Sequence, residues 1–368
     1  MRHRLPFLLA FTTAIVACQP DRQVPTELAR SDVDTVRGNV TAQEALFVLV
    51  PSPVLTSEQE ARLARIRNRL SSVEVHVALL RTAPEVALQV GRTVGFDVSP
   101  TRRFVALGEQ VPPRPAGVIS WAGPLQNEFG WVQLVLTSKG VTGTLHAPDA
   151  LYRFEPIGGG FHALIQIGTL PPEHPPESPS GAVQPSSEPP SGSAMIREAD
   201  LSTSSVPTTI DVLVVYTPAV TAAITDVAGL IQLAIDETNT SYSNSGVNAT
   251  LRSVYSSEVS YSEAGRTYQQ HVAALQSPSD GIMDIVHTWR NQYSADVVVL
   301  LVNDAAFCGL ASRILASQTT AFAAVYWRGS DTTCSAQSTS AITRLAVTNH
   351  RSLQDTSCQE PVQALKSS

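Results

Sequence analysis

The chain has 368 residues, of which 15% are charged, and a formal net charge of -7. It contains no block of basic residues, so we expect no nucleic-acid partner. The length allows two domains, and beyond the N-terminus no apolar run is long enough to span a membrane.

The N-terminal segment has the features of an export signal. Arg2 and Arg4 precede an apolar run at 5–17, which is too short for a folded membrane span. Small residues lead to Cys18, as in a bacterial lipobox, which predicts a lipoprotein-type signal peptide at 1–18 with Cys18 lipidated. The expected location is the cell envelope, in particular the outer membrane; an ordinary secretory signal and a secreted protein are the alternative. Residues 19–43 are expected to form a disordered tether.

Residues 44–170 are predicted to form a β-rich domain. Ala45–Val50 has the pattern of a strand, and Thr56–Gln59 fits a capping box before a helix. His146 and His162 are expected to be ordinary sheet residues, because two histidines without a third ligand rarely form a metal site. Further short β-type segments are separated by Gly and Pro, at 73–80, 102–107, 117–122, 131–137, 141–146, 151–155 and 161–167.

A Pro/Ser-rich tract at 171–209 lacks the apolar content of a core and is predicted to be a linker. Beyond it the pattern alternates between apolar strands and amphipathic helices, which predicts an α/β domain with a mixed sheet at 210–334. The fold class of the whole chain is therefore α+β. The expected strands and helices are Ile210–Tyr216, Asp226–Asn244, Ala249–Val259, Asp280–Gln292, Asp296–Val302 and Ala321–Trp327.

Five strings of this second region occur in a specific order: Ile210–Pro218, Ala234–Val247, Asp280–His287, Asn291–Val302 and Cys308–Ala311. Together they resemble the reprolysin-like, peptidyl-Asp type of bacterial zinc metallopeptidase, a branch of the metzincins. The β-rich region is similar to the leader, or propeptide-like, region upstream in such proteins. The resemblance implies an exported zinc-dependent endopeptidase that acts on peptide or protein substrates, with the leader holding it latent.

The zinc motif of that family is missing from this sequence. Family members bind Zn²⁺ through a helical His-Glu-x-x-His motif, whose Glu is the general base. None of the eight histidines here is followed by another histidine four residues later. His287 lies on a different helix and is expected to be structural. We therefore predict that the chain has no catalytic and no metal-binding residues and does not bind Zn²⁺.

The resemblance implies two further features. Cys308 and Cys334 match a cysteine pair of relatives, which implies a disulfide. The strand at 321–327 resembles the edge strand that binds an extended substrate by β-augmentation; an edge strand without that role is the alternative. The candidate substrate-binding residues are Ala321, Phe322, Ala323, Ala324 and Val325.

Three hypotheses account for the missing motif. In the first, the reading frame changes after about Cys334, so that 335–368 is an irregular tail; a shifted frame over Ala341–Ala346 can spell His-His-Glu-Ile-Gly. In the second, the protein is a lipid-anchored, non-catalytic peptide-binding or protein-binding module of the envelope. In the third, it is a different enzyme, but no Ser/His/Asp or Cys/His set has supporting context. Loss of the zinc helix also predicts that the strands at 210–216 and 296–302 lack part of their cover.

Overall fold

The computed structural model describes residues 45–109, 117–169, 171, 172, 175, 208–312 and 320–330, without the side chains of 329 and 330. The predicted signal peptide, tether and tail, with Cys18 and Cys334, lie outside the described residues, as does most of the predicted linker. Within the described part of the chain, no helix is long and apolar enough to cross a membrane.

The β-rich region is built on a seven-stranded antiparallel sheet, and all eight segments predicted as strands in this region are confirmed. Two elements were not predicted from the sequence: β3 (Thr93–Ser99), which forms a hairpin with β4 (Arg102–Leu107), and the short helix α2 (Pro84–Ala87). The sheet order is β1 (Phe47–Leu49), β2 (Ser72–Leu80), β9 (Phe161–Ile167), β8 (Leu151–Gly158), β7 (Gly140–His146), β6 (Trp131–Thr137) and β5 (Ile119–Pro124).

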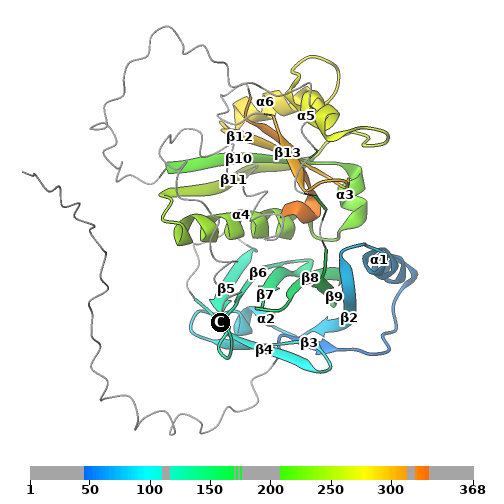
Figure 1. Ribbon diagram of the computed structural model, residues 1–368, viewed down its shortest axis with the longest axis vertical. Helices are drawn as coiled ribbons and strands as arrows, with labels where there is room; N and C mark the ends of the chain where they lie inside the picture. The colour runs from blue at the N-terminus through cyan, green and yellow to red at the C-terminus, as the bar shows by residue number, and fades with distance from the viewer. Residues whose placement is uncertain are drawn as a thin grey trace, which may run out of the picture. The chain divides into compact units, whose positions relative to one another are not determined.

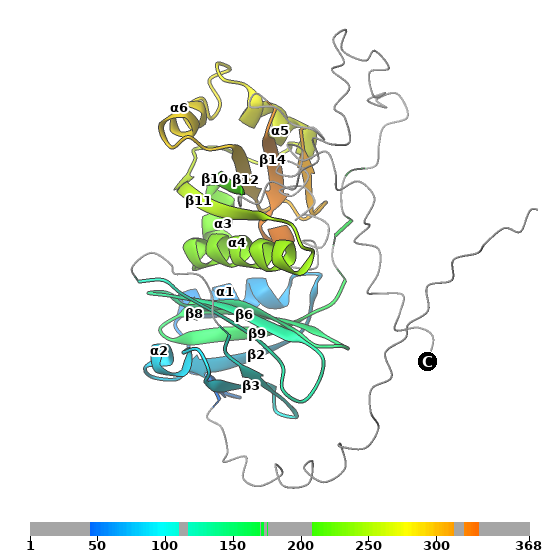
Figure 2. The same cartoon turned by 90° about the vertical axis from the view of Figure 1, so that its left-hand side faces the viewer.

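The predicted capping box begins helix α1 (Ser57–Arg67), where the Thr56 hydroxyl accepts from the Gln59 N–H and the Gln59 side chain accepts from the Thr56 N–H. The Gln59 amide also donates to the carbonyl of Gly158 at 2.8 Å, which ties α1 to β8. Leu63 and Ile66 of α1 pack on one face of the sheet. Because successive side chains of a strand point to opposite sides, the sheet has a second apolar face. The β3–β4 hairpin packs on that second face (Figure 2).

The second region is built on a mixed sheet, as predicted, but the sheet has a fifth strand in addition to the four that the sequence predicts. Four strands are parallel and the last is antiparallel, in the order β11 (Ala249–Glu258), β10 (Thr208–Tyr216), β12 (Val297–Val302), β14 (Phe322–Tyr326) and β13 (Gly309–Ala311). Helices α5 (Tyr268–Gln276) and α6 (Ile285–Gln292) lie on one side of this sheet, and α4 (Val227–Asn244) lies on the other (Figure 1). The helix α3 (Pro218–Ala223) follows β10, and a short 3-10 helix (Trp327–Ser330) follows β14.

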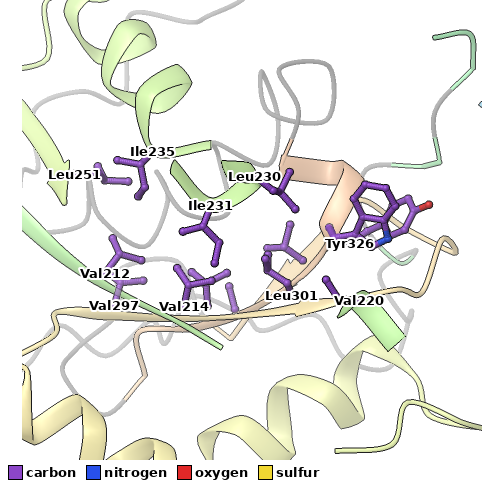
Figure 3. Close-up of a cluster of buried hydrophobic side chains, with 14 of the residues drawn as sticks. Val212, Val214, Val220, Leu230, Ile231, Ile235, Leu251, Val297, Leu301 and Tyr326 are labelled. Carbon is purple, nitrogen blue, oxygen red and sulfur yellow. The ribbon is translucent and has the colours of Figure 1, made fainter. Parts of the chain in front are cut away.

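Both faces of the sheet are covered. Val212 and Leu301 pack under Ile231 of α4 (Figure 3), whereas Val298 and Leu300 on the opposite face pack against α5 and α6. All six residues of β12 are buried. The prediction that these strands lack part of their cover is therefore wrong for the described residues.

Helix α4 begins at a side-chain cap, whereas α6 begins without one. The helix predicted from Asp226 is confirmed as α4, and Asp226 is its cap, because the Asp226 carboxylate accepts the Gly229 N–H at 2.9 Å. The helix predicted at 280–292 begins later, at Ile285. Asp280 accepts the Ile282 N–H within a preceding turn, so Asp280 is not the N-cap.

The polar side of α4 contacts the β-rich sheet. Thr137 and Thr142 donate to Asp226 at 2.8 and 3.1 Å, and the Ser120 hydroxyl donates to Asp236. The described residues of both regions belong to one compact unit, and α4 is buried between their sheets.

Candidate functional site

The edge of the five-stranded sheet differs from the predicted one. Phe322–Tyr326 forms β14, which pairs with β12 on one side and β13 on the other, so the assignment of Ala321–Val325 as an edge strand is wrong. All residues of β14 are buried, which agrees with the apolar run in the sequence. The strand at this edge is β13 (Gly309–Ala311), and β11 forms the opposite edge. β13 is too short for a strand pattern to identify it. The one sequence feature that marked this segment is the Cys308–Ala311 string, which is part of the family resemblance.

The register of β13 leaves backbone groups on its outer side. The Cys308 carbonyl accepts the Tyr326 N–H at 3.0 Å, and the Ser312 N–H donates to the Phe322 carbonyl at 2.9 Å. Because these groups alternate along an antiparallel strand, those of Gly309 and Ala311 point away from β14. No hydrogen bond from these groups to another described residue is present, and Ala311 is partly exposed. This arrangement suits the addition of an extended peptide.

Gly309 permits the close approach of β13 to β14. A Cβ at this position would lie 3.0 Å from the carbonyl oxygen of Ala324, closer than ordinary van der Waals contact. A larger residue would push the edge strand outward and weaken its pairing with β14.

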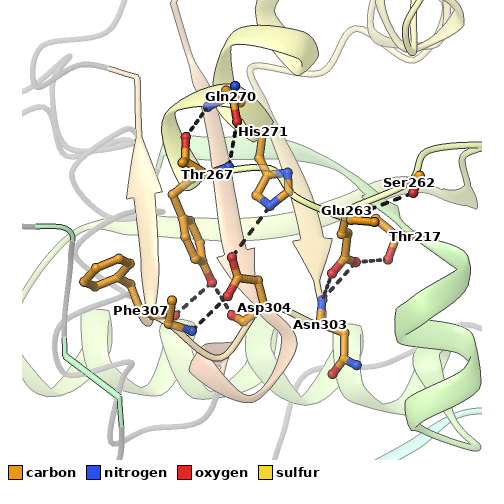
Figure 4. Close-up of polar contacts among 12 residues, drawn as sticks. Thr217, Ser262, Glu263, Thr267, Gln270, His271, Asn303, Asp304 and Phe307 are labelled. Atoms are coloured by element: carbon orange, nitrogen blue, oxygen red, sulfur yellow. Dashed lines mark hydrogen bonds and ion pairs between the residues drawn. The ribbon is translucent and has the colours of Figure 1, made fainter.

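A buried polar network fixes the loop that leads into β13. The Tyr268 hydroxyl lies 2.6 Å from the Asp304 carbonyl oxygen and 2.8 Å from that of Phe307. The Asp304 carboxylate accepts the Ala306 N–H at 2.9 Å. It also lies 3.8 Å from Nε2 of His271 (Figure 4). Burial lowers the pKa of His271, which favours its neutral form. This network positions the edge strand.

The loop that follows β12 is also fixed by side-chain hydrogen bonds. The Glu263 carboxylate accepts the Asn303 N–H at 2.9 Å and the Thr217 hydroxyl. Since Thr217 follows β10 and Asn303 follows β12, Glu263 joins the carboxyl ends of two neighbouring strands.

Cys308 brings the predicted linker to this edge. Its N–H donates to the Pro172 carbonyl at 2.8 Å, and its Sγ lies 3.5 Å from the Pro171 carbonyl oxygen. Cys308 is disulfide-bonded, and its partner lies outside the described residues. The pairing with Cys334 therefore stays a prediction.

A buried charge network lies where the chain leaves β14. Arg69 donates to both oxygens of Glu155 at 2.7 and 2.8 Å, and the Nε of Arg153 lies 3.1 Å away. Burial opposes ionisation of Glu155, but the guanidinium groups of Arg69, Arg153 and Arg328 lower its pKa below the ordinary value. The same three guanidinium groups lie 4.7–5.7 Å from the ring centroid of Trp327. The network thus joins the segment after β14 to the β-rich sheet.

The histidines singled out in the sequence have structural positions. His146 lies on β7 and His162 on β9, with β8 between them. His162 is fully buried, and its Nε2 accepts the Val141 N–H at 2.9 Å. His287 lies 3.1 Å from the Leu275 carbonyl oxygen and packs against Phe322. Each side chain supports the local fold.

The domain is of the α/β class: it has four parallel strands, a short antiparallel strand at one edge, and helices on both faces of the sheet. That edge can receive an extended chain. The model of Reprolysin_5, Metallo-peptidase family M12, matches residues 206–354. The chain is 32% identical over 318 residues to the peptidyl-Asp metalloendopeptidase of Xanthomonas campestris pv. campestris, covering 86% of this chain and 72% of that protein. The chain belongs to the M12 metallopeptidase family.

Two further comparisons concern a second relative and a solved structure. A peptidyl-Asp metalloendopeptidase of Stenotrophomonas maltophilia is 33% identical over 301 residues, covering 79% of this chain and 67% of that protein. Metalloproteinase-II from Bacteroides fragilis is a solved structure with a TM-score of 0.42 and 10% identity, covering 66% of this chain and 77% of the other. The family match extends past Cys334, after which the change of reading frame is expected. That change stays a prediction.

The M12 family implies zinc, and the residues that the structure describes do not form a zinc centre. In the part of the chain that the structure describes, no group of three or more His, Cys, Asp or Glu side chains could hold a metal ion. The full sequence also has no pair of histidines at the required spacing. No catalytic step through zinc can therefore be assigned to this chain.

Proposed function

We propose that this chain is an exported M12-family protein that neither binds catalytic zinc nor hydrolyses peptides. The observation that supports this is the absence of His-Glu-x-x-His from a sequence whose family match covers residues 206–354. The relatives are named peptidyl-Asp metalloendopeptidases, and we propose that this chain lacks that endopeptidase activity. A change of reading frame after about Cys334 is the cause we favour, and the nucleotide sequence around codon 334 tests it.

The activity itself is tested with the purified full chain and casein in the presence of zinc chloride. We expect no hydrolysis above that of buffer alone, whereas the Stenotrophomonas relative should digest casein under the same conditions. Hydrolysis by this chain that a zinc chelator abolishes would contradict the proposal.

The second candidate function is a non-catalytic peptide-binding module, and the geometry of β13 favours it. The outward backbone groups of Gly309 and Ala311 would pair with an extended peptide, while the loop held by Tyr268 keeps the edge in place. The ligand would be an extended segment of a peptide or protein.

Binding is measured with unfolded casein on the immobilised full chain. We expect Ala311→Pro to weaken retention about fivefold, because it removes one outward N–H, a contribution of about 1 kcal/mol. Ala311→Val keeps that N–H and should retain casein as the wild type does. Equal retention by both variants, or none by the wild type, would argue against this function.

We also propose the remaining domain assignments and the location. The 44–170 region would be a leader, 171–209 a linker, and Cys18 a lipidated residue that anchors the protein in the envelope, with a secreted form as the alternative. Mass spectrometry of the mature N-terminus tests the anchor: an acylated Cys18 is expected, and an unmodified soluble protein would contradict it.

A further inference from the structure

We propose that the contact between the β-rich region and α4 is a pH-responsive latch, which is firm in acidic medium and looser in neutral to alkaline medium. The contact is a seam of carboxylates on α4 that face hydroxyl groups of the β-rich sheet. Asp226, Asp236 and Glu237 supply the carboxylates, and all three are at most 4% exposed.

Two of these carboxylates have the donors that an ionised group requires. Asp226 accepts from Thr137, from Thr142 and from the Gly229 N–H. Asp236 accepts from Ser120 and, at 2.7 Å, from the amide of Gln232. Both carboxylates are therefore satisfied by hydrogen bonds in this contact.

Glu237 differs from these neighbours. Thr144 on β7 donates to its Oε1, but its Oε2 is buried and has no hydrogen-bond partner among the described residues. The positive charge of Arg153 on β8 favours ionisation of Glu237, whereas the negative charge of Asp236, the preceding residue of α4, disfavours it. An ionised Glu237 would thus be a buried charge with one neutral donor, which is unfavourable. A protonated Glu237 fits the same site without that cost.

Burial, the largest influence, raises the pKa of Glu237 from its ordinary 4.5 to about 7; Thr144 and Arg153 oppose this rise and Asp236 adds to it. Because the pKa is higher in the closed contact than in the open one, closure is favoured at low pH. The stabilisation is fully present below about pH 4.5, is lost as the pH rises, and is gone above about pH 7. Glu155 in the same contact has a lowered pKa and is held ionised by Arg69, so it stays charged between pH 5 and pH 8 and adds no pH dependence in that range.

The test uses the full chain with a protease site inserted between 176 and 207, cut after folding. The apparent Kd between the two pieces is measured by sedimentation at pH 5 and pH 8. We expect the Kd to be at least about tenfold higher at pH 8 than at pH 5. Each unit of difference between the pKa of Glu237 in the closed and the open contact can change the Kd by about tenfold, and the difference exceeds two units, so tenfold is a lower bound. Glu237→Gln, which mimics the protonated acid, should reduce the ratio to below about twofold.

The matched control is Glu60→Gln, which alters an exposed acid on α1 and should keep the wild-type ratio. Thr144→Val gives a second test if Glu237→Gln does not fold: it removes the hydroxyl that lowers the pKa of Glu237, so the midpoint should move to higher pH. An equal Kd at both pH values, no association at either, or a wild-type ratio in Glu237→Gln would overturn the proposal.

Discussion

Replacing Glu155 by alanine is expected to lower the free energy of unfolding by about 3–5 kcal/mol, because it leaves buried guanidinium groups without their counter-charge. Arg153 and Arg328 are each 1% exposed, so water cannot replace the lost carboxylate. The change removes contacts to Arg69 at 2.7 Å and to Arg153 at 3.1 Å at once. Urea unfolding of the full chain measures it.

Glu128→Ala is the control for that experiment. Glu128 lies 3.3 Å from Arg102, but about one third of each side chain is exposed to solvent. Surface ion pairs contribute about 0–1 kcal/mol, so this variant should unfold close to the wild type. Equal effects of the two substitutions would mean that the buried network around Glu155 does not stabilise the fold.

Replacing Phe322 by alanine is expected to cost about 3–5 kcal/mol of the free energy of unfolding. Phe322 is 1% exposed, lies in the interior strand β14, and packs against His287 and the guanidinium of Arg290. Truncation would leave a cavity between the sheet and α6. The same substitution at an exposed edge strand would be tolerated, so the result separates the two placements of this segment.

Phe129 provides the matched control, since it lies between β5 and β6 and is 86% exposed. Phe129→Ala should change stability by about 0.5 kcal/mol or less. A tolerated Phe322→Ala would contradict the interior position of β14.

The elements that the sequence predicted are those with strong local signals. The capping box at Thr56 and the cap at Asp226 identify helix starts through contacts three residues apart. Helix α5 was missed although Thr267 and Gln270 form the same kind of box, so closer attention to that pattern would have found it. The apolar run of β14 gave the strand but not its neighbours, which depend on pairing with distant segments.

The candidate site was less predictable because its parts are far apart in the sequence. Arg69 and Glu155 are separated by 86 residues, and Arg328 and Ser71 by 257. A helix with Asp236 and Glu237 on its polar side is ordinarily taken to place them in solvent. Only the packing of α4 between two sheets shows that these carboxylates are buried.

The zinc content of the purified full chain tests the central claim most directly. After incubation with zinc chloride and removal of weakly bound metal, elemental analysis should find well below one zinc per chain, because the sequence lacks the His-Glu-x-x-His ligands. The Stenotrophomonas relative, treated in parallel, should retain zinc. One tightly bound zinc per chain, together with chelator-sensitive hydrolysis of casein, would contradict the account.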